Sequence, residues 1–202
     1  MNRVLILFAH PRYEESRTNQ VLVKAIPRTE AITFHDLYEL YPDFNIDVET
    51  EKQLLLEHDI VIWHHPLYWY SAPPLVKQWI DLVLEFKWAY GPGGDALKGK
   101  MAFNAVTSGG PREAYQQNSR NRFTLQEFLR PFEQTVRLCH MTYLPPFAVQ
   151  GTHRLTESNL EQCGLEYRQI LQRFTEREFN TDEILKHEYL QDWLMESKTL
   201  ES

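Results

Sequence analysis

Cysteine is scarce in this sequence, and long apolar runs are absent. The 202 residues include only Cys139 and Cys163, which stand far apart and form no Cys-x-x-Cys pair. A disulfide framework and a zinc ribbon are therefore excluded, and a reducing compartment such as the cytoplasm is expected. The apolar stretches 4–9 and 60–63 fall well short of the roughly 20 residues that cross a bilayer. We expect a soluble chain without an export signal.

An excess of positive charge is also missing. The formal net charge is −7 at pH 7, which argues against a nucleic-acid-binding protein or a general binder of anionic membranes. The acidic residues gather at the end of the chain, where residues 175–202 hold eight Asp and Glu against three Lys and Arg. We therefore expect one domain over residues 1–174, nearly neutral, and an acidic helical tail over residues 175–202.

Short apolar runs alternate with segments of helical period, a pattern typical of a parallel sheet covered on both faces. Strands are expected at 3–9, 31–35, 59–64, 100–107 and 142–149, and helices at 17–26, 49–57, 74–86, 125–138 and 157–174. Pro145 and Pro146 break the last of these strands, because proline removes a donor from the ladder. This alternation predicts an α/β flavodoxin-like three-layer sandwich with a five-stranded parallel sheet in the order 2-1-3-4-5. In such a sheet, ligands bind beyond the carboxyl ends of the strands.

The loop after the first strand combines features of an anion site. It contains no glycine, so it is neither a Walker loop nor a Gly-x-Gly-x-x-Gly turn. Ser16 can cap the following helix, whose first backbone N–H groups are free to bind an anion. His10 and Arg17 add positive charge, while Thr18 and Asn19 add side-chain donors. The loop indicates a phosphate site, although an ordinary serine cap beside a strand-ending histidine explains it as well.

The loop after the third strand is aromatic. Pro66 and Leu67 are followed by Tyr68, Trp69 and Tyr70 at the expected end of a central strand. Aromatic side chains are costly to leave in water unless they line a pocket or a partner surface. A planar ligand stacking on this segment is one interpretation, and core packing or a dimer seam is the other.

The histidine pair His64-His65 does not predict a metal site. Adjacent strand residues point to opposite faces of a sheet, and no carboxylate or cysteine stands at ligand spacing. After the fourth strand come Thr107, Ser108, Gly109 and Gly110. Consecutive glycines let the backbone approach a ligand closely and turn N–H groups toward negative charge. Three such loops at one sheet edge together indicate a binding site.

Several short motifs follow one another along the chain. They are Ala-His-Pro (9–11), Ser-Arg-Thr-Asn (16–19), Asp-Leu-Tyr (36–38), Pro-Leu-Tyr-Trp-Tyr-Ser (66–71), Lys-Gln-Trp-Ile-Asp (77–81), Tyr-Gly-Pro-Gly-Gly (90–94), Leu-Lys-Gly-Lys (97–100) and Thr-Ser-Gly-Gly (107–110). In this order, and over roughly residues 3–174, the chain resembles the flavodoxin-like NAD(P)H:quinone oxidoreductases. Within that family, residues 41–47 and 144–147 are most similar to the ancillary proteins of glutathione-regulated potassium efflux systems.

The resemblance implies roles for individual residues. His10 and the segment 16–19 would bind the flavin phosphate and ribityl chain, the segment 67–70 would lie along the isoalloxazine ring, and residues 108–110 would meet its pyrimidine end. Tyr115 matches a catalytic tyrosine that delivers a proton or stabilises charge. A histidine follows that tyrosine six residues later in part of the family, whereas this chain has Asn121. Arg120 or Arg122 is the alternative source of charge stabilisation.

The resemblance also implies an activity. A bound FMN would pass two electrons as hydride from NAD(P)H to a quinone in a homodimer, with FAD as the alternative flavin. A second hypothesis is a regulatory subunit that binds a membrane potassium–proton antiporter at the inner face of the cell membrane. A one-electron flavodoxin is the third.

The acidic tail offers a candidate contact for such an antiporter. Asn180 can cap a helix that places apolar side chains on one face. These are Ile184, Leu185, Tyr189, Trp193 and Leu194. A solvated helix and a dimer strap are the alternatives.

Overall fold

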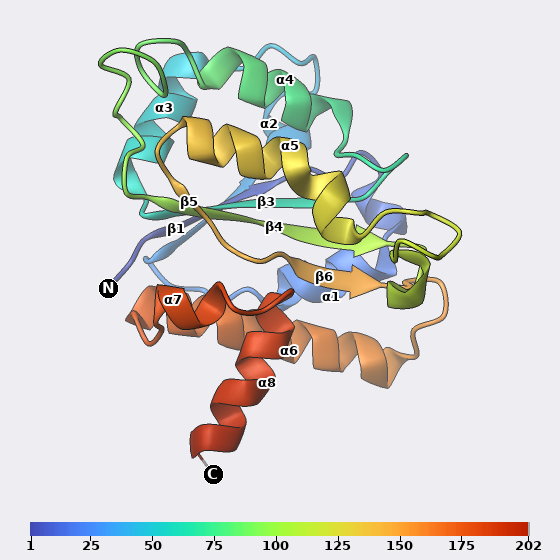
Figure 1. Cartoon of the computed structure of the whole chain (residues 1–202). Coiled ribbons are helices and arrows are strands. Elements are labelled where there is room, and N and C mark those ends of the chain that lie inside the picture. The colour runs from blue at the N-terminus through green and yellow to red at the C-terminus, as the bar shows by residue number, and fades with distance from the viewer. Residues whose placement is uncertain (202) are drawn as a thin grey trace.

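The computed structural model describes residues 1–201, which form a parallel sheet between two layers of helices (Figure 1). The strands are β1 (Val4–Phe8), β2 (Ile32–Asp36), β3 (Ile60–Pro66), β4 (Met101–Ser108), β5 (Thr142–Tyr143) and β6 (Phe147–Gln150). The order across the sheet is β2-β1-β3-β4-β5, and the paired strands are parallel. The predicted three-layer fold and strand order are confirmed. The order reverses direction between β1 and β3, which is where such sheets bind ligands.

The fifth strand, expected over residues 142–149 with a break at its two prolines, is interrupted at that point. Pro145 and Pro146 divide it into β5 and β6, because proline has no N–H to donate to the ladder. β5 pairs with the beginning of β4 and β6 pairs with its end, over residues 105–108. β6 therefore continues the fifth position in the sheet and brings it to the ligand-binding edge.

The helices begin close to the predicted positions. They are α1 (Arg17–Ala25), α2 (Leu37–Leu40), α3 (Val48–Glu57), α4 (Pro74–Val83), α5 (Leu125–Leu138), α6 (Glu157–Glu176), α7 (Thr181–Ile184) and α8 (Leu190–Glu201). α5 begins with a capping box in which Thr124 and Glu127 exchange hydrogen bonds. α4 ends at Val83 rather than at residue 86, because Leu84 leaves helical geometry at φ −84° and ψ 68°. The short α2 was not expected; Asp36 caps it by accepting from two backbone N–H groups.

Each face of the sheet carries its own apolar core. On one face α2 to α5 pack against side chains such as Leu5, and on the other α1, α6 and the C-terminal helices pack against side chains such as Ile6. Figure 1 shows these helix layers above and below the sheet. The alternation of Leu5 and Ile6 follows from the two-residue period of a strand. None of the helices that the structure describes is both long and apolar enough to cross a membrane.

The C-terminal segment does not form one helix with a single apolar face. It forms two separate helices, α7 and α8, and Asn180 caps the first by accepting from the Asp182 N–H over 2.9 Å. Ile184, Trp193 and Leu194 are buried in the same apolar core as the side chains of α1 and α6. Of the interpretations open from the sequence, a free contact face and a solvated helix are therefore both wrong for these three side chains, because the chain's own body covers them.

Candidate functional site

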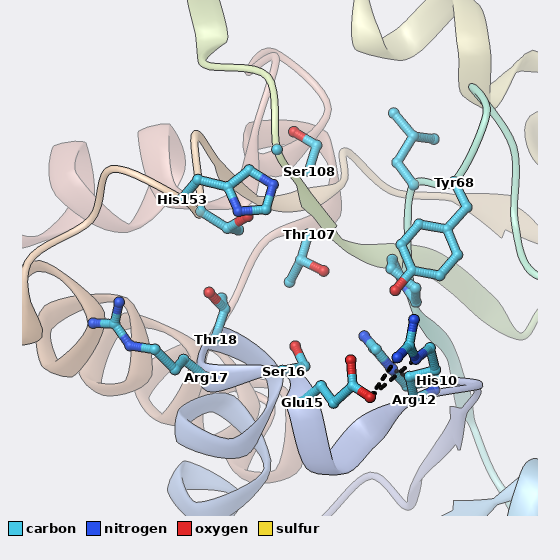
Figure 2. Close-up of a pocket in the computed structure, with 14 residues that line it drawn as sticks. His10, Arg12, Glu15, Ser16, Arg17, Thr18, Tyr68, Thr107, Ser108 and His153 are labelled. Carbon is cyan, nitrogen blue, oxygen red and sulfur yellow. Dashed lines mark hydrogen bonds and ion pairs between the residues drawn. The ribbon is translucent and has the colours of Figure 1, made fainter.

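A cleft of about 470 Å³ opens at the carboxyl ends of β1, β3 and β4 (Figure 2). It brings together the three predicted loops, which lie far apart in the sequence, and the loop after β6 (Phe147–Gln150). Ten of the predicted site residues line it: His10, Ser16, Arg17, Thr18, Pro66, Leu67, Tyr68, Thr107, Ser108 and Gly109. Its volume lies within the roughly 300–1,000 Å³ of ligand pockets.

One end of the cleft is the N-terminus of α1. Ser16 caps this helix, since its Oγ accepts from the Asn19 N–H over 3.3 Å. The first N–H groups of a helix have no acceptor within the helix, and the helix dipole favours an anion beside them. Figure 2 shows Ser16, Arg17 and Thr18 on this helix end. This end of the cleft therefore suits a phosphate.

His10 lies beside that anion site. Its Nδ1 accepts a hydrogen bond from the Arg12 N–H over 3.2 Å, so the neutral ring carries its proton on Nε2. Burial lowers the pKa of His10. The ring also meets Tyr68 edge-on, with centroids 5.9 Å apart. His10 can thus act as a neutral hydrogen-bond donor at neutral pH.

Asn19 lies behind the cleft rather than on its surface. It is buried, and its Nδ2 donates to Ser16 Oγ over 2.8 Å and to Thr107 Oγ1 over 3.1 Å. Its Oδ1 accepts from His64 Nε2 at 3.0 Å, and His64 Nδ1 in turn meets the Tyr167 hydroxyl at 3.3 Å. The chain of bonds fixes the positions of Ser16 and Thr107, which do line the cleft.

The aromatic segment after β3 turns back on itself. Tyr68 and Ser71 exchange backbone hydrogen bonds of 2.9 and 3.0 Å, and Trp69 and Tyr70 between them have positive φ angles of 48° and 65°. Such a two-residue turn favours Asn and Gly, so two aromatic residues there carry backbone strain. Leu67 and Tyr68 line the cleft, whereas Trp69 is 93% exposed. Tyr70 stacks on Phe128 with ring centroids 5.0 Å apart.

The loop after β4 forms the other end of the cleft. The Ser108 and Gly110 carbonyls accept from the N–H groups of Thr152 and Gly151, over 3.1 and 2.8 Å. A Cβ atom on Gly109 would lie 2.8 Å from His153 Nε2, closer than van der Waals contact allows. Glycine therefore permits the close approach of this loop to the next one.

Tyr115 does not line the cleft. It is 7% exposed and packs behind Gly110, where its hydroxyl would lie 3.1 Å from a Cβ on that glycine. Its ring also meets Phe128 edge-on. Asn121, six residues after Tyr115, accepts a long hydrogen bond of 3.5 Å from the Tyr70 hydroxyl. Tyr115 thus lies beside the glycine loop. Tyr70 and Asn121 contact each other and do not line the cleft.

Four residues of the cleft were not predicted: Arg12, Glu15, Thr152 and His153. Arg12 and Glu15 form an ion pair across the first loop (Figure 2). Thr152 and His153 follow β6, at the same edge of the sheet. Because ligands bind at the carboxyl ends of the strands, the loop after the last strand was the signal for Thr152 and His153.

The two adjacent histidines are buried on opposite faces of the sheet. His64 contacts Asn19 and Tyr167, whereas His65 stacks on Phe132 and accepts from Asn104 Nδ2 over 3.0 Å. Burial lowers the pKa of His64 to about 3 and that of His65 to about 4. Within residues 1–201, no group of three or more His, Cys, Asp or Glu side chains is arranged to hold a metal.

The fold and this cleft define a class of protein. Residues 2–171 match the family model described as flavodoxin-like fold, and the chain belongs to that family.

Among its relatives is the glutathione-regulated potassium-efflux system ancillary protein KefG of Serratia proteamaculans, 44% identical over 82% of this chain and 90% of that protein. A solved structure of general stress protein 14 from Treponema denticola in complex with FMN is 37% identical, with a TM-score of 0.80 over 84% of this chain and 98% of the other. An NADPH-quinone reductase from P. pentosaceus is 36% identical, with a TM-score of 0.76 over 83% and 96%.

Proposed function

We propose that this chain is a flavin-dependent NAD(P)H:quinone oxidoreductase with FMN as its resident cofactor. The observation that carries the proposal is the cleft itself, which has an anion site at a helix N-terminus and a glycine loop at its other end. The relatives named as an NADPH-quinone reductase and as an FMN complex support the same conclusion.

The residues of the cleft fit the parts of FMN. The phosphate would meet the first N–H groups of α1 together with His10, Ser16 and Thr18, and the Arg17 guanidinium would add charge. Leu67 and Tyr68 would provide an apolar wall for the ring. When bound, FMN would supply the hydride acceptance and donation that protein side chains lack.

Charge stabilisation falls to the loop after β4. The backbone at Ser108, Gly109 and Gly110 would hydrogen-bond the polar edge of the flavin and offset negative charge there. Tyr115 would donate a hydrogen bond to the reduced quinone oxygen from its place beside Gly110. Trp69 and Tyr70 would cover the substrate side of the ring. Asn19 would act by holding Ser16 and Thr107 in place.

The test is to purify the full-length protein, record its absorbance between 350 and 500 nm, and identify the released flavin. We expect FMN rather than FAD, and turnover of a small quinone with NADH or NADPH. Tyr115→Phe should lower quinone turnover while the flavin stays bound. A colourless protein that binds neither FMN nor FAD on reconstitution would overturn the proposal.

We also propose a role beside a potassium efflux system, because the KefG relative is 44% identical over 165 residues. In this role the chain works in the cytoplasm and binds the inner face of the membrane through a potassium–proton antiporter. The domain of residues 1–174 would bind flavin, and residues 175–202 would complete it. Deleting the tail does not test docking, because Trp193 is part of the core. Co-sedimentation of the intact protein with antiporter-containing vesicles, against antiporter-free vesicles, tests it directly.

A homodimer is the assembly we propose. Trp69 and Phe123 are exposed beside the Tyr70–Phe128 stack, at the aromatic side of the site. Exposed aromatic side chains that gather in one place are typical of interfaces. Light scattering should give twice the chain mass for the native protein and a lower mass for Trp69→Ser. A native protein of single-chain mass at micromolar concentration would contradict the dimer.

A further inference from the structure

The C-terminal segment contacts the flavin-site loop through Arg112. This residue follows the glycine pair and begins the short 3-10 helix η2 (Arg112–Ala114). Its Nη1 and Nη2 donate to the two carboxylate oxygens of Asp192 over 3.2 and 3.1 Å. The guanidinium also lies over the Tyr189 ring, with Cζ 4.3 Å from the ring centroid. A bidentate ion pair combined with an aromatic contact holds a guanidinium in one orientation.

Residues 188–192, which we name the C-terminal clamp, are anchored independently of Arg112. The Gln191 side chain accepts from the Ala148 N–H over 3.3 Å and donates to the Ala148 carbonyl over 2.7 Å. It therefore occupies the edge of β6 as a neighbouring strand would, and an uncovered edge is otherwise open to other chains. The Leu190 N–H donates to the Pro146 carbonyl over 3.0 Å. From α5, Gln126 Nε2 donates to the Glu188 carbonyl over 2.9 Å.

The loop that Arg112 belongs to is held on its other side by the segment after β6. Gly151 and Thr152 donate to the carbonyls of Gly110 and Ser108, over 2.8 and 3.1 Å. Arg112, two residues beyond Gly110, ties the same loop to the C-terminal clamp instead. Arg112 therefore adds a polar anchor to a segment whose other contacts with the body include the packing of Ala114 and of the Tyr115 ring.

We propose that Arg112 is a positioning residue of the flavin site, through which the C-terminal clamp holds loop 108–115 at the end of the cleft. This inference rests on the proposed flavin-dependent function. The family match ends at residue 171, so the clamp lies in the part of the chain beyond it. Exposed ion pairs commonly contribute little, but here the guanidinium also packs on the buried Tyr189 ring, and Gln191 holds the chain beside Asp192 against β6. The partners of Arg112 are therefore held in place by the clamp rather than by the ion pair alone.

Asp192→Ala tests the contact from a residue that lies outside the flavin cleft. The matched control is Asp182→Ala, which removes the same charge from an exposed position on α7. Hydrogen–deuterium exchange of residues 108–116 in flavin-free, full-length protein is the first measurement. We expect exchange of this peptide to become severalfold faster in Asp192→Ala and to stay unchanged in Asp182→Ala. The second measurement is FMN affinity from fluorescence quenching, with an expected fivefold rise in Kd for Asp192→Ala alone.

Two further variants keep the test decisive. Arg112→Lys retains the charge but cannot pair bidentately, so it should give the same faster exchange even if Asp192→Ala folds poorly. The charge-exchanged pair Arg112→Asp with Asp192→Arg should recover part of the native protection. Unchanged exchange in folded Asp192→Ala and Arg112→Lys would overturn the inference while leaving the proposed function intact. A wild-type protein that binds no FMN would overturn the proposed function and, with it, the flavin role of Arg112, whatever the exchange shows.

Discussion

The His64 ring donates its Nε2 proton to Asn19 Oδ1 over 3.0 Å, joining the end of β3 to the first turn of α1. Both side chains are buried, and the Tyr167 hydroxyl completes the bonding of the ring from α6. Asn19 passes this constraint on to Ser16 and Thr107. Asn19, which does not itself line the cleft, thus holds two residues that do.

Asn19→Ala should loosen that end of the cleft. The change leaves a buried imidazole donor without its acceptor and frees the Ser16 and Thr107 hydroxyls. Because an unsatisfied buried polar group costs about 1–3 kcal/mol, we expect a loss of this size in the free energy of unfolding. FMN affinity should fall about tenfold, as a 1.4 kcal/mol effect requires. Urea denaturation and flavin titration measure the two effects, with the exposed Asn118→Ala as control. Native values in Asn19→Ala would show that the bond network does not shape the site.

Acid should destabilise the protein through the buried histidines His64 and His65. Burial lowers the pKa of His64 to about 3 and that of His65 to about 4, from 6.5 in the unfolded chain. Below pH 6.5 the unfolded chain binds the extra protons first, so the free energy of unfolding falls as the pH falls toward the folded values. For each histidine, the free energy of unfolding should be roughly 2 kcal/mol lower at pH 5 than at pH 7.5.

His65→Gln isolates one part of this pH dependence. Glutamine can still accept from Asn104, but it does not titrate. Urea denaturation of both proteins at pH 5.0, 6.0 and 7.5 should therefore show a shallower decline for the variant. Identical slopes would mean that His65 contributes no linkage.

Glu51 is a buried carboxylate that depends on three donors. His35 Nε2 and the Tyr41 hydroxyl each lie 2.6 Å from Oε1, and Trp79 Nε1 lies 2.7 Å from Oε2. Burial alone would raise the pKa of Glu51, but these hydrogen bonds outweigh it and the pKa is lowered. Glu51→Ala should cost about 3 kcal/mol, because it leaves the three partners buried and unpaired. Chemical denaturation beside the exposed Glu49→Ala, expected within about 0.5 kcal/mol of wild type, provides the comparison.

Trp193 tests whether the C-terminal segment belongs to the core. It stacks on Phe174 with ring centroids 6.0 Å apart and planes 9° from parallel, and it is buried. Trp193→Ala should therefore lower the free energy of unfolding by about 3–5 kcal/mol, as large-to-small core substitutions do. Met195→Ala, two residues along the same helix and exposed, should change it little. Thermal unfolding that is equal in the two variants would place Trp193 outside the core.

Much of the site was predictable because it depends on where strands end. His10, Ser16 and Ser108 stand at such ends, so a correct strand order was enough to bring them to one cleft. Trp69 and Tyr115 show where this reasoning stops. Whether an aromatic residue enters the cleft depends on the turn at Tyr68–Ser71 and on packing behind Gly110, and neither has a local signal in the sequence.

By itself, the sequence determined the sheet order, the helix starts and the loops that meet at the cleft. Hydrophobic period and capping act over a few residues and so reveal the strands and helices, and the connection rules of α/β folds then predict the strand order. Only the tertiary structure decided the fate of the C-terminal segment and of Asn19. The apolar spacing of residues 184–194 is compatible with a free docking face and with a buried one. Packing against the body of the chain buries it. Likewise, Asn19 became a support for the site because folding brought His64, 45 residues away in sequence, within hydrogen-bonding distance.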